Sequence, residues 1–227
     1  MRKLIYISIL LTLGFASAFG QGLYPLGEGN EVNKVELVAQ ADNGVYIFDV
    51  TSASTYKLYT WNGFNYSDLG VIPNIPKHGD ANNEDFRIVD ALYDNDVLYV
   101  LGHDFGTSKS NLPTRVITWD GLEWKDITTS DVSSALSVAK LIKYNNKVSI
   151  LGIFTSSGIL SLNSGSWEHV GGQLGTDAKN NYVLDAAVYR GRLYASGEFT
   201  RPLSGQQYNT AVFENNAWRP VVTPPFI

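Results

Sequence analysis

The most informative part of the chain is residues 89–102, which read VDALYDNDVLYVLG. Two runs of apolar and β-branched residues lie on either side of Asp94, Asn95 and Asp96. Such a pattern is typical of a β-hairpin, because Asn and Asp reach the positive φ angles of a tight turn at low cost. We therefore predict a pair of strands over Ile88–Tyr93 and Val97–Gly102.

The same pattern recurs along the chain. The residues that precede the four turns are Ala41, Tyr93, Tyr144 and Tyr189, which lie about 45–52 residues apart. A second signature follows each turn: an apolar residue, a short turn, and an aromatic residue five positions later. It reads WNGFNY from Trp61, WDGLEW from Trp119, LNSGSW from Leu162 and FENNAW from Phe213. Each repeat is therefore predicted to contain two hairpins, formed by strands a, b, c and d.

A repeated four-stranded antiparallel unit of about 45–50 residues is the pattern of a β-propeller blade. We predict an all-β propeller of about four blades, covering residues 28–70, 86–127, 137–171 and 182–222 within one domain, 21–227. Residues 23–27 resemble a d strand and are a candidate closing strand, which would leave one d strand over. Three explanations stay open: the segment is not a strand, the ring is open and self-associates through an unpaired blade edge, or the chain is part of a larger propeller.

Two of these segments also carry a family resemblance. LYASGEFT at Leu193–Thr200 and WDGLEW at Trp119–Trp124 resemble the repeats of secreted bacterial kelch-like or galactose-oxidase-like propellers. The chain departs from kelch repeats in lacking a double glycine after strand b. Galactose-oxidase-type radical chemistry needs a Cys joined to a Tyr, and the chain has no Cys.

The first twenty residues have the layout of a secretory signal peptide. Arg2 and Lys3 precede an uncharged apolar run, and small residues follow at Ala16-Ser17-Ala18. We predict cleavage after Gly20 and a secreted, periplasmic or cell-surface protein. The apolar run is shorter than the roughly 20 residues needed to cross a bilayer, so no membrane insertion of the mature chain is expected.

Composition narrows the functional classes further. The absence of Cys excludes disulfides and thiolate metal sites. With 17 Lys and Arg against 22 Asp and Glu, the net charge is -5, so the chain has no basic surplus for nucleic acid. Motifs of nucleotide-binding loops, zinc proteases and serine hydrolases are missing. The histidines are scattered over different repeats, so they would form a triad only through the fold.

Loop lengths indicate which side of the propeller binds a ligand. The a–b and c–d turns stay short in every repeat, whereas the b–c and d–a connections, which lie on the opposite side, vary in length. Long polar loops on a rigid scaffold are where binding residues usually lie. The residues predicted to bind are Lys77, His78, Asp80 and Asp85 of the connection 71–85, His103 and Asp104 of 103–114, and Arg201 and Tyr208 of 199–209.

Two further groups of residues bear on these sites. Asp80, Asn82 and Glu84 alternate oxygen ligands and would suit calcium, but the loop lacks the spacing of an EF-hand, and a solvated acidic loop is the alternative. We otherwise assign no metal, cofactor or catalytic residue. Strand a is normally innermost in a blade, so its ionisable residues face either the central pore or outward. These residues are Asp90, Lys140, Lys143 and Asp185.

The aromatic residues of the second signature have a structural explanation. A blade has two apolar faces and packs each of them on a neighbouring blade. Tyr66, Trp124, Trp167 and Trp218 are predicted to be wedges between blades.

These patterns favour a secreted non-catalytic propeller that binds a protein or glycan through its b–c and d–a loops. One alternative is a hydrolase or lyase that acts on extracellular polysaccharide with carboxylates at the pore mouth. The other is a structural repeat segment of a surface assembly.

Overall fold

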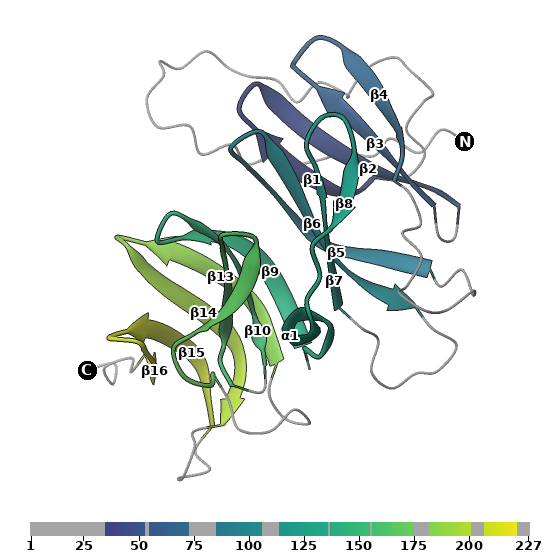
Figure 1. Ribbon diagram of the computed structural model, residues 1–227. Coiled ribbons are helices and arrows are strands. Elements are labelled where there is room, and N and C mark those ends of the chain that lie inside the picture. The colour runs from purple at the N-terminus through teal and green to yellow at the C-terminus, as the bar shows by residue number, and fades with distance from the viewer. Residues whose placement is uncertain are drawn as a thin grey trace, which may run out of the picture. The chain divides into compact units, whose positions relative to one another are not determined.

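A computed structural model describes residues 35–52, 55–72, 85–105, 114–135, 137–154, 156–174, 182–200 and 207–221. The chain divides into Met1–Asn33 and Lys34–Ile227, and all described residues belong to the second unit. Their strands form four antiparallel four-stranded sheets, each with its strands in chain order (Figure 1). The predicted fold class, an all-β propeller with about four blades, is confirmed.

We number the sheets as blades 1 to 4 in chain order. Blade 1 contains β1 (Val35–Ala41), β2 (Gly44–Ser52), β3 (Thr55–Trp61) and β4 (Tyr66–Val71). Blade 2 contains β5 (Asp85–Asp94), β6 (Val97–Phe105), β7 (Thr114–Trp119) and β8 (Trp124–Asp126). Blade 3 contains β9 (Ser137–Tyr144), β10 (Lys147–Ile153), β11 (Ile159–Asn163) and β12 (Ser166–Val170). Blade 4 contains β13 (Tyr182–Tyr189), β14 (Arg192–Thr200), β15 (Gln207–Glu214) and β16 (Ala217–Pro220).

The hairpin of blade 2 corrects the predicted alignment by one residue. Asp94 pairs with Val97, so the two-residue loop is Asn95-Asp96, and both loop residues have positive φ. Asp94, and not Tyr93, therefore corresponds to Tyr144 and Tyr189 in the later blades. The sequence left this register open because three consecutive residues, Asp94 to Asp96, all favour turns.

Each described blade supplies its own fourth strand: β4, β8, β12 and β16. None of these sheets needs a d strand from residues 23–27, which lie outside the described residues.

Several strands are also longer than predicted. Asp85 begins β5, His103 and Asp104 lie within β6, and Tyr208 lies within β15. These residues were predicted in loops, but the ladder of backbone hydrogen bonds continues through them.

A short helix, α1 (Ser130–Ser133), precedes blade 3. Its Val132 is buried in the core between blades 2 and 3. In the sequence, residues 132–142 are the stretch that favours a helix, but α1 begins before it and includes only its first two residues. The second half of that segment is strand β9, as the alignment of the repeats predicts.

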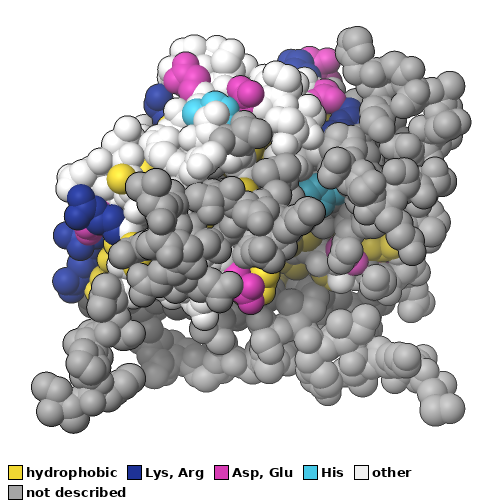
Figure 2. All heavy atoms as spheres, turned by 90° about the horizontal axis from the view of Figure 1, so that it is seen from below, with side chains coloured by type: hydrophobic (Ala, Val, Ile, Leu, Met, Phe, Trp, Pro, Cys, Tyr) yellow, Lys and Arg dark blue, Asp and Glu magenta, His cyan; other side chains and the backbone are white. Residues whose placement is uncertain are grey.

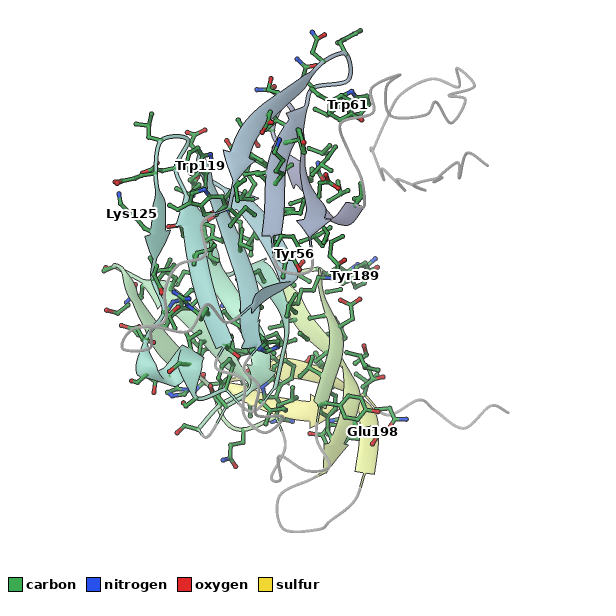
Figure 3. All side chains as sticks on the ribbon, turned by 90° about the vertical axis from the view of Figure 1, so that its right-hand side faces the viewer. Tyr56, Trp61, Trp119, Lys125, Tyr189 and Glu198 are labelled. Carbon is green, nitrogen blue, oxygen red and sulfur yellow. The ribbon has the colours of Figure 1, made fainter. Side chains whose placement is uncertain are left out.

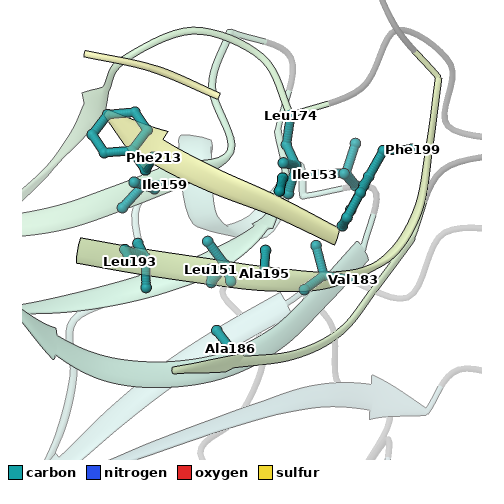
Figure 4. Packing of buried hydrophobic residues seen from close by; sticks show 11 residues of the cluster. Leu151, Ile153, Ile159, Leu174, Val183, Ala186, Leu193, Ala195, Phe199 and Phe213 are labelled. Carbon is teal, nitrogen blue, oxygen red and sulfur yellow. The ribbon is translucent and has the colours of Figure 1, made fainter. Parts of the chain in front are cut away.

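The hydrophobic core consists of layers between successive blades. We call the face of a blade that packs on the following blade its leading face, and the opposite face its trailing face. Phe48 and Leu58 of blade 1 share a cluster with Leu98 and Val100 of blade 2. A second cluster joins blades 2 and 3. The third, between blades 3 and 4, includes the residues labelled in Figure 4. Contacts between the a strands link β1 to β5, β5 to β9, and β9 to β13.

The aromatic signature lies on the trailing faces. Trp119 and Trp124 of blade 2 stack at 5.3 Å between ring centroids and pack on the core shared with blade 1. Trp167 is 4% exposed, and its Nε1 donates a hydrogen bond of 3.0 Å to Ile127 O of the preceding repeat. Trp218 packs on the third cluster. Tyr66 stacks on Trp61 of the same blade, and Figure 3 labels Trp61.

Gly158 shows why small residues are needed beside these rings. A Cβ atom at Gly158 would lie 2.5 Å from Trp218 Nε1 and 2.7 Å from Leu174 Cβ. The indole of blade 4 therefore fits against blade 3 only because residue 158 has no side chain. No helix among the described residues has the length and apolar character to span a membrane.

Candidate functional site

The a strands share a distortion next to the row of ionisable residues. In each of the four blades, the a strand has one extra residue where it pairs with the b strand, which is a β-bulge. The extra residues are Glu36, Val89, Ala139 and Leu184. A bulge bends the strand and redirects the next side chain, and bulges are frequent beside active sites. The residue after each bulge therefore occupies a repeated, specially oriented position.

Ionisable residues follow three of these bulges and connect neighbouring blades. They are Asp90 on β5, Lys140 on β9 and Asp185 on β13, while blade 1 has Leu37. Lys140 Nζ lies 2.6 Å from Asp185 Oδ1, and Leu141 N donates to Asp90 Oδ2 at 2.8 Å. We call Asp90, Lys140 and Asp185 the inner row. The sequence singled out these residues on the a strands, and the structure brings them together.

The two carboxyl groups of the inner row have pKa values shifted in opposite directions. Burial raises the pKa of Asp90, and this effect outweighs the hydrogen bonds from Leu141 N and Ala91 N, which lower it. Burial would also raise the pKa of Asp185, but the hydrogen bonds from Lys140 Nζ and Ala186 N outweigh it, so the pKa is lowered. The row thus combines a carboxyl group whose pKa is raised with one whose pKa is lowered.

A second ion pair links the same strands nearer the a–b turns. Lys143 Nζ on β9 contacts Asp94 Oδ1 on β5. The sequence places Lys143 on an a strand together with the residues of the inner row. In the structure, however, it pairs with Asp94 and is not adjacent to a bulge. Asp94 is mostly buried on its side-chain surface. This pair therefore joins blades 2 and 3 and adds no second site.

A Ser-His-Asp constellation occurs in blade 3 and is not a nucleophilic triad. Ser157 Oγ lies 2.8 Å from His169 Nδ1, and His169 Nε2 lies 3.7 Å from Asp131 Oδ1. Ser157 Oγ also lies 2.7 Å from Ile159 O, which can only accept, so the hydroxyl proton goes there. His169 Nδ1 must then donate to Ser157 and cannot act as its base. Ser157 is also 1% exposed, out of reach of a substrate.

The predicted loop residues are described only in part. Lys77, His78, Asp80 and Arg201 lie outside the described residues, and so does the calcium candidate around Asp80. The side chains of Asp85 and Asp104 are also not described. Asp85 pairs with Phe105, and Phe86 with Asp104, so both acids lie at the open end of the β5–β6 hairpin.

Two of the predicted binding side chains are described, and both are engaged within the fold. His103 Nδ1 lies 3.2 Å from Thr114 Oγ1 on the neighbouring strand. Tyr208 OH donates to Leu174 O at 2.9 Å, and its ring packs on Phe199. Both side chains therefore have structural contacts. Among the described residues, no group of three or more His, Asp or Glu side chains is arranged to hold a metal ion.

Sequence reasoning missed the bulges and the Ser157–His169 contact. A bulge leaves no fixed residue signature, since Glu, Val, Ala and Leu all occupy it here. The repeat alignment could have found the inner row as one equivalent position, but the one-residue error in blade 2 placed Asp90 out of line with Lys140 and Asp185.

Neither a protein-family model nor a curated protein matches the chain. Solved structures are similar to it at low identity. Xylan beta-1,4-xylosidase from Bacillus halodurans C-125 has a TM-score of 0.50 and 10% identity over 83% of this chain and 41% of its own. A GH43 endo-arabinanase from Bacillus licheniformis has a TM-score of 0.46 and 12% identity over 77% and 69% of the two chains. PorZ, a surface component of the type-IX secretion system of Porphyromonas gingivalis, has a TM-score of 0.40 and 12% identity over 83% of this chain and 30% of its own.

The chain thus spans less than half the length of the xylosidase. At this identity the likeness shows a common fold, which is the β-propeller that the four sheets also show. The comparisons support no kelch-like or galactose-oxidase-like repeat, so that resemblance extends only to the propeller architecture.

Proposed function

We propose that this chain binds and hydrolyses a polysaccharide at the inner row. The observation that carries the proposal is the pair of carboxyl groups, Asp90 and Asp185, whose pKa values are shifted in opposite directions across one lysine. Glycosidic bonds are cleaved by two carboxyl groups of which one donates a proton and the other is ionised. Environments that separate the pKa values of two such groups indicate their roles.

In this scheme Asp90 is the general acid and Asp185 the base. Asp90 gives its proton to the glycosidic oxygen as the bond to the anomeric carbon breaks. Asp185 takes a proton from the water that attacks the anomeric carbon. Lys140 keeps Asp185 ionised and fixes its orientation through the 2.6 Å contact. After turnover, proton exchange with water returns both carboxyl groups to their starting states.

The charge of the chain favours a neutral glycan over an acidic polymer. The net charge is small and negative. In Figure 2, both acidic and basic side chains occur on the described part of the surface. Because the xylosidase has the same fold, xylan is the first substrate to test, and arabinan is the second substrate to test.

A second candidate is the non-catalytic binding of a glycan or protein. It is favoured by the contacts of Asp90, whose carboxyl group accepts hydrogen bonds from two backbone amides, Ala91 N and Leu141 N. Such a carboxyl group has a structural role at the junction of blades 2 and 3. In this candidate the inner row holds the blades together, and the ligand lies on the loops.

The experiment measures the release of reducing ends from xylan and arabinan, together with binding to each polymer. We compare the wild type with Asp90→Asn, Asp185→Asn and the matched control Asp68→Asn, an exposed acid of β4 paired with Lys57. We expect hydrolysis by the wild type and the control, and at least a 100-fold loss in each inner-row variant with binding retained. Binding without hydrolysis in the wild type supports the second candidate. If the wild type neither hydrolyses nor binds either polymer, the proposal is wrong.

A further inference from the structure

The leading face of blade 4 differs at its centre from the leading faces of the other blades. In every blade, the residue after the bulge pairs with one residue of the b strand, which pairs in turn with one residue of the c strand. In blades 1 to 3 these b-strand and c-strand residues are apolar, at most 1% exposed, and packed in a core layer with the next blade. They are Phe48 with Leu58, Leu101 with Val116, and Leu151 with Ile159.

Blade 4 has two hydroxyl groups at these positions. Asp185 pairs with Ser196, and Ser196 pairs with Thr210. Ser196 is half-buried and Thr210 is exposed. We call Asp185, Ser196 and Thr210 the blade 4 stripe. The stripe crosses three neighbouring strands, β13, β14 and β15, and it begins at the inner row.

The residue two positions further along β14 shows the same change. Glu198 is exposed and pairs with Tyr182, whereas its counterpart in blade 3, Ile153, is buried in a core layer. A side-chain hydrogen bond to Glu198 raises the pKa of Tyr182. Another blade on this face would remove Ser196, Thr210 and Glu198 from water, and apolar packing would not offset the cost. The leading face of blade 4 is therefore not built to pack on a blade.

The same face is also not built only to meet water. Large apolar side chains flank the stripe on β13, where Tyr182 is 39% exposed, Leu184 68% and Tyr189 59%. Figure 3 shows Tyr189 and Glu198 towards opposite ends of the β13–β14 hairpin. A terminal face that meets only solvent is normally polar. Apolar groups gathered on one exposed strand indicate contact with a ligand or a partner.

This mixture of groups fits a glycan. A sugar ring has hydroxyl groups at its edge and C–H groups on its faces. The hydroxyl groups of Ser196 and Thr210 can both donate and accept hydrogen bonds, and a Tyr ring has an apolar face beside a polar hydroxyl group. A protein interface has an apolar centre and a polar rim. The face of blade 4 has the reverse arrangement, with its polar groups at the centre and its apolar groups beside them.

We propose that the blade 4 stripe binds a glycan chain, part of which lies at the inner row. Asp185 belongs to both sites, so the chain extends from the Lys140–Asp185 pair across Ser196 to Thr210. The inference rests on the proposed function in one respect, which is that the inner row receives a glycan. Binding at the stripe needs no hydrolysis. The stripe predicts that a glycan long enough to reach it binds more tightly than a short one.

The test measures dissociation constants by calorimetry for thio-linked xylobiose and xylohexaose, which resist hydrolysis, and for the matching arabino-oligosaccharides. Ser196→Leu introduces the residue that blade 3 has at this position, and Ser196→Ala removes only the hydroxyl group. We expect Ser196→Leu to weaken binding of the preferred hexasaccharide by at least about tenfold and Ser196→Ala to weaken it less. Both losses should be smaller for the disaccharide. The control Ser67→Leu changes an exposed serine of β4 and should bind like the wild type.

The outcomes separate this inference from the proposed function. Equal hexasaccharide affinities in the wild type and Ser196→Leu overturn the stripe, even if the wild type hydrolyses xylan. An equal loss for the disaccharide and the hexasaccharide in Ser196→Leu also overturns it. A length-dependent loss supports the stripe, even if the wild type hydrolyses no polymer. A wild type that binds no oligosaccharide overturns both. If light scattering shows wild-type dimers that dissociate in Ser196→Arg, a second copy occupies the face and the inference is wrong.

Discussion

The ion pair between Arg115 and Asp126 joins neighbouring strands β7 and β8 in blade 2. The Arg115 side chain is 7% exposed and that of Asp126 33%. Burial alone would raise the pKa of Asp126, but the hydrogen bonds from Thr128 and Arg115 outweigh it, so the pKa is lowered. A carboxyl group with a lowered folded pKa stabilises the fold when it is charged, and this contribution is lost as the pH falls through that pKa.

We expect Asp126→Asn to lower the free energy of unfolding by about 2 kcal/mol at pH 7, because a charged acceptor is lost from a mostly buried guanidinium. The difference from the wild type should begin to shrink below about pH 4, where the unfolded chain takes up a proton at Asp126, and should be lost as the pH falls through the lowered pKa of the folded carboxyl group. Urea titrations at pH 7 and pH 3 check this. A difference that grows at pH 3 would contradict the assignment.

Trp167 tests the role of the aromatic wedges. It is buried between blades 2 and 3, and its indole nitrogen bonds to Ile127 O. We expect Trp167→Ala to cost about 3–5 kcal/mol and Trp167→Phe less, since Phe keeps most of the packing but loses the hydrogen bond. Leu122→Ala, at an exposed turn, is the control. A loss below about 1 kcal/mol for Trp167→Ala in urea titration would refute the wedge.

At the scale of elements, the hairpin loops set the register of each blade. Asn145 and Asn146 have φ of 49° and 60°, which a two-residue hairpin turn requires. We expect Asn146→Gly to be neutral or stabilising by up to about 1 kcal/mol, because Gly adopts this conformation freely. Asn146→Val should destabilise by about 1–2 kcal/mol, because a β-branched residue is strained there. Thermal unfolding of the two variants gives the comparison, and equal melting temperatures would contradict it.

The sequence predicts the elements better than it predicts their distortions. Turn residues and alternating apolar residues locate most of the strands, since both signals are local. The bulges at Val89, Ala139 and Leu184 were not predicted, because they arise from pairing between strands and have no common side chain. The sequence therefore predicted only part of the inner row. Its residues could be named from the a strands, but their contacts depend on how neighbouring blades pack.

At the scale of the whole molecule, the propeller is a linear series of blades joined by three core layers. In such a series each blade is stabilised by its neighbours. Blades 2 and 3 each have a described blade on both faces, and we expect their b strands, β6 and β10, to exchange amide hydrogens more slowly than β14 of blade 4. Hydrogen exchange followed by mass spectrometry measures this. Faster exchange in β10 than in β14 would contradict the layered account.

The overall architecture was predictable because the repeat multiplies weak local signals, and four similar segments identify a propeller where one would not. The predicted binding loops could not be tested in the same way. Of their residues, Lys77, His78, Asp80 and Arg201 lie outside the described part of the chain, and Tyr208 is engaged in the core.

The central claim is that the inner row is where this chain meets a glycan. The most direct measurement is a titration of isotopically labelled protein with xylo- and arabino-oligosaccharides, followed by amide chemical shifts in NMR spectra. The account predicts that the shifts change most at the bulges of β5, β9 and β13, around Asp90, Lys140 and Asp185. Changes confined to residues away from these strands, or no change at saturating oligosaccharide, would contradict it.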